Sequence, residues 1–116
     1  MFYNSIGSVK VDGLLKLPRF FRRTFAARKA ALATEGCVEV RLFRRGRQFF
    51  ALSIWESPVA MKGYAQTSVH RTFMEEDADL FITFHNAIWT SQTVPTDEEA
   101  VAVWEESDAK RAAGAG

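Results

Sequence analysis

Residues 53–74, SIWESPVAMKGYAQTSVHRTFM, contain the clearest structural signals of the chain. The segment begins inside an alternating apolar run, which predicts a β-strand that ends at Trp55. Ser57 and Pro58 then predict the start of a helix. A serine side chain accepts hydrogen bonds from free backbone N–H groups, and proline suits the first helical turn.

The second half of this segment predicts a break in the helix. Thr67 or Ser68 is a second capping candidate inside residues 58–76, and His70 and Arg71 follow at once. The segment therefore has the pattern of a strand ending in Trp, a serine-capped helix, a helix break and a Ser-x-His-Arg motif. It resembles the antibiotic biosynthesis monooxygenase-like families of the dimeric α/β-barrel superfamily, and most nearly their spheroidene monooxygenase-like members.

The rest of the chain supplies the other elements of one small domain. Alternating apolar residues predict strands, apolar residues three or four positions apart predict helices, and Arg45-Gly46 predicts a hairpin turn. Thr96 to Glu99 fits a capping box, Thr-x-x-Glu, which opens a last helix. The expected strands are 3–11, 37–43, 48–55 and 80–89, and the expected helices are 18–34, 58–76 and 96–104.

This order, β-α-β-β-α-β, predicts an α+β ferredoxin-like fold. We expect residues 1–94 to form that domain, and residues 95–116 to form a C-terminal helix with a frayed, flexible tail from about Ala112. The resemblance implies that two such domains pair as a dimeric α/β barrel.

Bulk properties favour a cytoplasmic protein without a membrane span. The 116 residues are 47% hydrophobic, and no apolar run approaches the roughly 20 residues that cross a bilayer. The first residues lack the pattern of a signal peptide, and the single cysteine excludes an internal disulfide.

Charge is divided unevenly along the chain. Residues 1–74 hold 13 Lys and Arg against 4 Asp and Glu, a net charge of +9, whereas residues 75–116 hold 2 against 10, a net charge of −8. Such asymmetry indicates complementary faces within one protomer or between two, or solvated helix faces that differ in sign.

The alternation in each strand predicts two faces of a sheet, of which only one is wholly apolar. We expect that face to lie under helices and the other, mixed face to pack against a second copy, because a domain of this size has helix enough for one face. The apolar set is Val38, Val40, Leu42, Phe50, Leu52, Ile54, Ile82, Phe84 and Ile88. The mixed set is Cys37, Glu39, Arg41, Phe43, Phe49, Ala51, Ser53, Trp55, Phe81, Thr83, His85, Ala87 and Trp89.

His70 is the first candidate for chemistry, because imidazole serves as acid, base or metal ligand near neutral pH. Its alternative role is to cap the helix break. In the haem-degrading branch of the resembled families, a helix histidine binds iron, flanked by an asparagine on the first strand and a tryptophan on the helix. The resemblance thus implies roles for His70 as haem ligand and for Asn4 and Tyr64 as its catalytic neighbours.

We expect a pocket between helices and sheet for a hydrophobic small molecule. Trp55, Phe21 and Phe25 are its predicted walls, and Arg71 is predicted to meet a carboxylate such as a haem propionate. No glycine-rich phosphate loop occurs, so bound flavin or nicotinamide is not expected. Haem is one candidate cofactor. The substrate's own electron-rich system, as in the cofactor-free oxidations of the family, is another.

A basic stretch over residues 19–47, interleaved with phenylalanines, raises the alternative of RNA binding. Ala51 and Ser53 stand where an RNA-recognition sheet needs stacking aromatics, so we expect no nucleic-acid partner. Three functions stay open at this point: a small monooxygenase acting on an aromatic or polyene substrate, a non-catalytic dimeric ligand-binding or interaction module, and a nucleic-acid binder.

Overall fold

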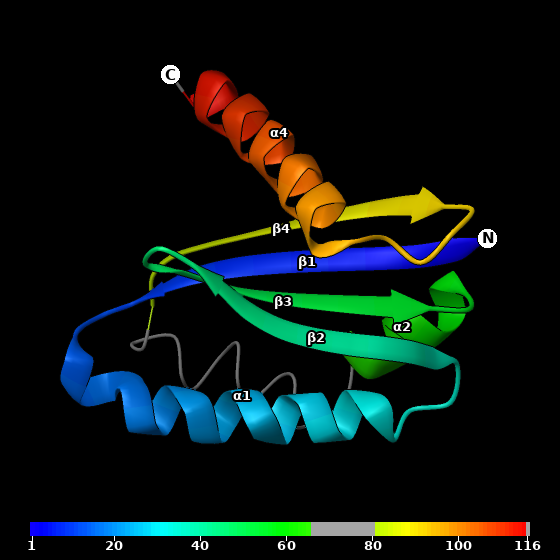
Figure 1. The fold of residues 1–116 in the computed structure, drawn as a ribbon, viewed down its shortest axis with the longest axis horizontal. Coiled ribbons are helices and arrows are strands. Elements are labelled where there is room, and N and C mark those ends of the chain that lie inside the picture. The colour runs from blue at the N-terminus through cyan, green and yellow to red at the C-terminus, as the bar shows by residue number, and fades with distance from the viewer. Residues whose placement is uncertain (66–80, 116) are drawn as a thin grey trace.

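The computed structural model describes residues 1–65 and 81–115 of the chain. Figure 1 shows a twisted four-stranded sheet with helices on both faces. The elements are β1 (Phe2–Val11), a 3-10 helix η1 (Leu14–Lys16), α1 (Leu17–Leu32), β2 (Cys37–Arg45), β3 (Gln48–Trp55), α2 (Pro58–Ala65), β4 (Phe81–Ser91) and α4 (Asp97–Ala115). No described helix is long and apolar enough to cross a membrane.

The strand order is β2-β3-β1-β4, and all neighbouring strands are antiparallel. This confirms the α+β ferredoxin-like fold. The two predicted helix starts are also confirmed. The Ala60 N–H donates to Ser57 Oγ at 3.1 Å, and the Glu99 N–H donates to Thr96 Oγ1 at 3.1 Å.

The residues that share a sheet face differ from our expectation, because even-numbered residues of one strand can lie beside odd-numbered residues of the next. The turn pairs Arg45 with Gln48, so odd positions of β2 share a face with even positions of β3. Val40 and Leu42 therefore lie beside Ser53 and Ala51. The expected apolar set is split between the two faces, and so is the expected mixed set.

One face of the sheet, the α1 face, lies under α1 and α2. It carries Tyr3, Ser5, Gly7, Val9, Val40, Leu42, Phe49, Ala51, Ser53, Trp55, Asn86 and Ile88. The α4 face carries Phe2, Asn4, Ile6, Ser8, Glu39, Arg41, Phe43, Phe50, Leu52, Ile54, His85, Ala87, Trp89 and Ser91.

α4 packs on the second face, which we had expected to need a partner chain. Ala100 and Trp104 join Ile6, Leu52 and Ile54 in one buried cluster. Burial of such apolar side chains contributes about 1.5–3 kcal/mol each. An uncovered sheet face is therefore no longer an argument for a homodimer.

Opposite charges hold the start of α4 against β2. Arg41 donates to Asp97 Oδ1 at 3.0 Å, to the Pro95 carbonyl at 2.9 Å and to Glu39 Oε1 at 2.8 Å. These contacts raise the pKa of Arg41 further above its usual range, with the Glu39 hydrogen bond as the largest cause. Part of the charge asymmetry of the sequence is thus matched within one chain.

The last helix is longer than predicted. It continues past Trp104 to Ala115, so residues 112–115, which we expected to fray, are helical. Lys110 pairs with Glu106, and Arg111 pairs with Asp108, at the helical spacings that stabilise an exposed helix. The C-terminal half projects away from the body of the protein (Figure 1).

Gly36, in the loop between α1 and β2, lies against the start of α2. Its φ is +88°, and its carbonyl accepts the Glu56 N–H at 2.8 Å. A Cβ atom at this position would lie 2.6 Å from the Ala60 Cβ. Only glycine fits, because both the backbone conformation and the space exclude a side chain.

Candidate functional site

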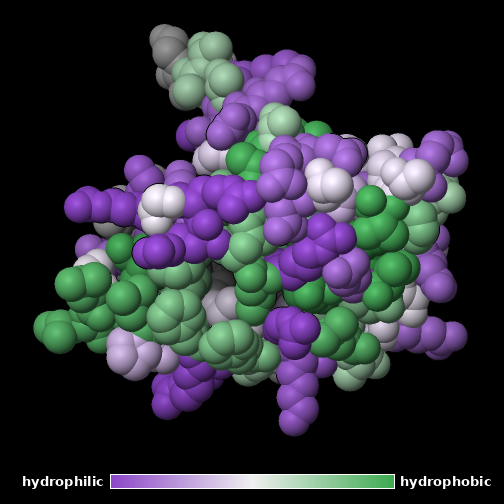
Figure 2. All heavy atoms as spheres, viewed as in Figure 1, coloured by the Kyte–Doolittle hydropathy of each residue, from purple (hydrophilic) through white to green (hydrophobic). Residues whose placement is uncertain are grey.

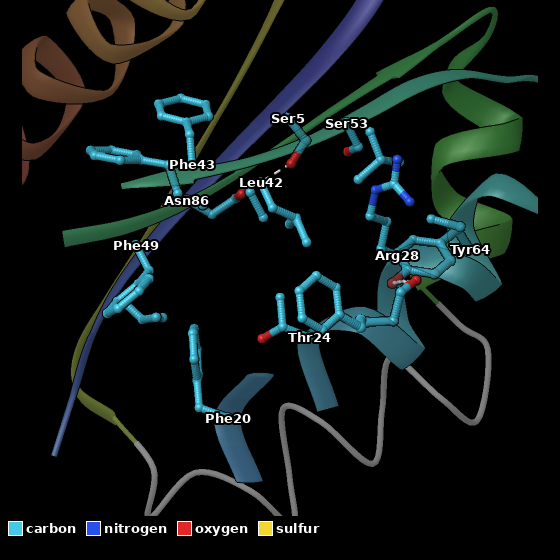
Figure 3. A pocket seen from close by; sticks show the side chains of 18 of the residues that line it. Ser5, Phe20, Thr24, Arg28, Leu42, Phe43, Phe49, Ser53, Tyr64 and Asn86 are labelled. Atoms are coloured by element: carbon cyan, nitrogen blue, oxygen red, sulfur yellow. Dashed lines mark hydrogen bonds between the residues drawn. The ribbon is translucent and has the colours of Figure 1, made fainter. Parts of the chain in front are cut away.

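A cavity of about 390 Å³ lies between α1 and the sheet. Figure 3 shows side chains from α1, α2 and the α1 face of the sheet around it, whereas Phe43, which belongs to the α4 face, points away from it. The lining is mostly apolar. It consists of Ser5, Gly7, Val9, Phe20, Phe21, Thr24, Phe25, Ala27, Arg28, Ala31, Val40, Leu42, Phe43, Arg44, Phe49, Phe50, Ala51, Ser53, Trp55, Met61, Tyr64 and Asn86.

Phenylalanines form one end of the cavity. Phe20 from α1 packs on Phe49 from β3, with ring centroids 5.0 Å apart. Phe21 meets Phe49 edge-on at 5.7 Å and stacks with Phe25 at 6.3 Å. Phe20 is buried, whereas Phe25 is 59% exposed. The aromatic wall therefore runs from the core to the mouth of the cavity.

Trp55 and Tyr64 form the other end. Their rings stack with centroids 5.6 Å apart and an interplanar angle of 25°. Trp55 is fully buried at the end of β3, beside Ala31 and Val40. Tyr64 reaches it from α2, whose start is fixed by the Ser57 cap. The pair offers a flat, rigid wall for a planar ligand.

The Tyr64 phenol is held neutral. Its hydroxyl donates to the Ala27 carbonyl of α1 at 3.0 Å. Burial, followed by the charge of Cys37, raises the pKa of Tyr64 to about 12. Tyr64 is therefore suited to shaping the cavity and is a poor general base near neutral pH.

Two buried polar atoms of the lining have no hydrogen-bond partner among the described residues. They are Thr24 Oγ1 and Trp55 Nε1. Another polar pair is satisfied: Ser5 Oγ donates to Asn86 Oδ1 at 3.0 Å. An unpaired buried polar group costs about 1–3 kcal/mol, so a ligand that pairs with Thr24 or Trp55 recovers that free energy.

All charged residues of the described lining are arginines. Arg28 extends from α1 toward the sheet on the side of Ser53 and Tyr64 (Figure 3), and Arg44 lies on β2. Both side chains are exposed, and neither forms an ion pair among the described residues. The mouth of the cavity is therefore positively charged.

The structure brings together four of the seven residues predicted from the sequence. Phe21, Phe25, Trp55 and Tyr64 all line the cavity. His70 and Arg71 lie outside the described residues, so their roles stay predictions.

Asn4 does not join them, because it lies on the α4 face. It is fully buried, and its Nδ2 donates to Ser91 Oγ at 2.9 Å. Asn4 pairs with Ile54, one residue before Trp55, so the two side chains point to opposite faces of the sheet. Asn4 therefore lies away from this cavity, whereas the resemblance had implied that it stands beside Tyr64 in the site.

Sequence reasoning missed Thr24, Arg28 and Asn86. Helical spacing carries a signal for two of them. Arg28 follows Phe25 by three residues and Phe21 by seven, and Thr24 follows Phe20 by four. Asn86 needed the register of β4, which pairs it with Gly7.

His85, the histidine within the described residues, contacts α4. Its Nε2 lies 2.9 Å from Ser107 Oγ, and its carbonyl accepts the Trp104 indole N–H at 3.0 Å. Within residues 1–65 and 81–115, His, Cys, Asp and Glu form no group of three that would hold a metal ion. The described cavity lining contains neither an imidazole nor a thiolate for haem iron.

The geometry defines a class of protein: a small ferredoxin-like α+β domain with an apolar pocket under its first helix. The sequence profile described as antibiotic biosynthesis monooxygenase matches residues 19–76, half of the chain. The chain belongs to this family and has its small monooxygenase-like fold.

Solved structures agree on the fold. Rv0793 from Mycobacterium tuberculosis has a TM-score of 0.73 at 10% identity, covering 83% of this chain and 100% of that one. PA3566 from Pseudomonas aeruginosa has a TM-score of 0.70 at 14% identity, covering 79% and 95%. A variant of SnoaB, a cofactor-independent oxygenase from Streptomyces nogalater, has a TM-score of 0.69 at 13% identity, covering 83% and 98%. No protein of curated function matches the sequence.

Proposed function

We propose that this protein is a small monooxygenase that oxidises a planar, hydrophobic aromatic or polyene substrate in the cavity beneath α1. The cavity is apolar, and aromatic rings form both of its ends. Such walls bind flat conjugated molecules through burial and offset stacking.

The observation that carries the proposal is the unpaired indole N–H of Trp55. This residue is fully buried and lines the cavity, yet its Nε1 has no partner among the described residues. A substrate carbonyl or phenol oxygen would accept this hydrogen bond. The Thr24 hydroxyl offers a second polar contact, so an oxygenated aromatic ring would be held in one orientation.

The substrate's own conjugated system is the electron source that we favour. In such a reaction a ring methylene takes up O2, becomes a carbonyl and releases water, so no external reductant is required. A structural relative described as a cofactor-independent oxygenase supports this version. A haem-dependent version rests on His70 and Arg71, which lie outside the described residues.

The runner-up function is a ligand-binding module without catalysis. Tyr64 favours it, because a phenol with a pKa of about 12 does not abstract protons efficiently near neutral pH. In either function we propose that the protein is a homodimer, as the family resemblance implies, and that it is cytoplasmic, as the bulk properties of the sequence favour.

Anthrone, a planar tricyclic ketone with a reactive methylene, is a suitable test substrate. We expect it to quench tryptophan fluorescence on binding, and we expect oxygen uptake with formation of the quinone above the spontaneous rate. Binding without added turnover would favour the ligand-binding module.

Trp55→Phe and Thr24→Val test how the substrate is held. Trp55→Phe keeps an aromatic ring but removes the N–H donor, so we expect binding to weaken about tenfold, as for the loss of one hydrogen bond. Ile88→Val, an exposed change on β4 outside the described lining, is the control. Unchanged binding in both pocket variants would overturn the proposed orientation.

A further inference from the structure

Two leucines at the start of the helical layer lie in solvent. Leu14 is 82% exposed and Leu15 is 98% exposed in η1, immediately before α1. We call them the leucine tip. Figure 2 shows apolar side chains gathered at the same end of the molecule. Exposed apolar residues that cluster in this way mark interaction surfaces.

The leucine tip is continuous with the mouth of the cavity. Phe21 and Phe25 follow along α1, one turn apart, and are 39% and 59% exposed. Both line the cavity. A surface that covers the leucine tip would therefore also approach the entrance of the binding site.

The helix that follows the leucine tip is basic. α1 contains no acidic residue. Asp12 is already paired with Lys16 at 3.3 Å. Arg22, Arg28 and Lys29 are exposed on α1. A partner for this end of the molecule must combine negative charge with an apolar interior.

We propose that the leucine tip docks on an anionic lipid bilayer, with the mouth of the cavity held close to the membrane surface. The leucines enter the headgroup boundary, and the exposed Arg22, Arg28 and Lys29 of α1 meet the lipid phosphates. An apolar ligand dissolved in the bilayer then reaches the cavity without crossing water. This surface role is separate from the reaction in the cavity, and each can fail without the other.

The alternative occupants fit less well. RNA supplies negative charge but no aliphatic interior for two leucines. A second copy would offer the exposed acidic half of α4, where Glu105 and Glu106 lie among alanines and charged residues and give little apolar area. The bilayer is the partner that matches both the apolar and the basic part of the surface.

Cosedimentation with vesicles tests the proposal. We expect the protein to bind vesicles of phosphatidylcholine and phosphatidylglycerol in equal parts, and to bind pure phosphatidylcholine vesicles weakly. Replacing both leucines, Leu14→Ser with Leu15→Ser, should lower the partition coefficient at least tenfold. Val59→Ser is the matched control, since Val59 is 79% exposed on α2, away from the tip.

A reporter for insertion completes the test. The fluorescence of Leu15→Trp should be quenched by brominated acyl chains, whereas that of Val59→Trp should not. Absence of vesicle binding, or equal binding by the double serine variant, would overturn the proposal. So would leucine-dependent association of the protein with itself, or tight RNA binding, in place of vesicle binding.

Discussion

The two faces of the sheet are covered by helices in different ways. On the α4 face, Phe50 meets Trp104 edge-on with centroids 5.3 Å apart, and the Trp104 indole N–H is paired with the His85 carbonyl. On the α1 face, α1 stands over a cavity of about 390 Å³, and Ala51 in its floor is exposed.

Polar atoms follow this division only in part, because Asn4 Oδ1 on the α4 face is also buried without a hydrogen-bond partner among the described residues. Arg41 forms hydrogen bonds with both Glu39 and Asp97 on the α4 face. Thr24 Oγ1 and Trp55 Nε1 in the cavity have no partner among the described residues. Dense packing and satisfied hydrogen bonds stabilise a fold, whereas space and unpaired donors are features of binding sites. The comparison assigns stability mainly to the α4 face and ligand binding to the α1 face.

Trp104→Ala should give the largest loss of stability. Removing a buried tryptophan leaves a void and unpairs the His85 carbonyl, so we expect the free energy of unfolding to fall by about 3–5 kcal/mol. Urea denaturation measures it. Phe25→Ala on the cavity side is the comparison, and it should cost under about 1 kcal/mol because Phe25 is half exposed. Equal losses would contradict the division between the two faces.

Ala51→Phe tests whether the space in the α1 face is the binding site. Ala51 lies between Gly7 of β1 and Leu42 of β2, so a ring there fills the cavity from its floor. Ligand affinity should fall at least tenfold, about 1.4 kcal/mol, with little change in unfolding. Ala51→Ser keeps the space and should bind normally. If Ala51→Phe binds as the unmodified protein does, the ligand lies elsewhere.

Tyr64→Phe tests the hydrogen bond that connects α2 to α1. Loss of the hydrogen bond to the Ala27 carbonyl should cost about 1 kcal/mol near neutral pH. Because folding raises the Tyr64 pKa from 10.0 to about 12, its neutral form adds stability below pH 10 that is lost as the pH rises to 12. The variant should therefore lose less stability over that interval. An identical alkaline profile would show that Tyr64 ionises freely in the folded protein.

Glu39→Gln should have the smallest effect. The hydrogen bond from Arg41 lowers the pKa of Glu39, so the carboxylate stabilises the fold above the usual glutamate range, and this contribution is lost as the pH falls through the folded value. Glu39 is partly exposed, so the effect should stay under about 1 kcal/mol. Acid titration of stability in both proteins measures it, with the shallower slope expected in Glu39→Gln.

Local signals in the sequence predicted the elements well. The Ser57 cap, the Thr96 capping box and the bounds of β3 agree with the structure, because each depends on neighbouring residues. The end of α4 was predicted too early. Two ion pairs stabilise its last turns, one between Lys110 and Glu106 and one between Arg111 and Asp108. Their helical spacing is visible in the sequence, but the prediction did not use it.

Long-range placement was harder to predict. The alternation within each strand was predicted correctly, but even-numbered residues of β2 were assigned to the same face as even-numbered residues of β3. The two-residue turn between Arg45 and Gln48 already implies that odd residues of β2 share a face with even residues of β3. Asn4 was placed in the site by the resemblance to the haem-degrading branch, whereas its pairing with Ile54 puts it on the opposite face from Trp55. In the cavity, Phe21, Phe25 and Trp55 were predicted from their aromatic character, and Tyr64 from the family resemblance. Asn86 depends on the pairing of β4 with β1, which local pattern does not specify.

Gly36 gives the cavity a fixed width at its Trp55 end. Because Ala60 lies where a Cβ would stand, α2 sits closer to the end of α1 than any other residue would permit. A methyl group there would displace α2 and separate Tyr64 from Trp55, which now stack at 5.6 Å. The absence of a side chain at Gly36 thus limits how thick a molecule this end of the cavity accepts. A substitution at this position should therefore change the range of substrates, although Gly36 itself lies outside the cavity lining.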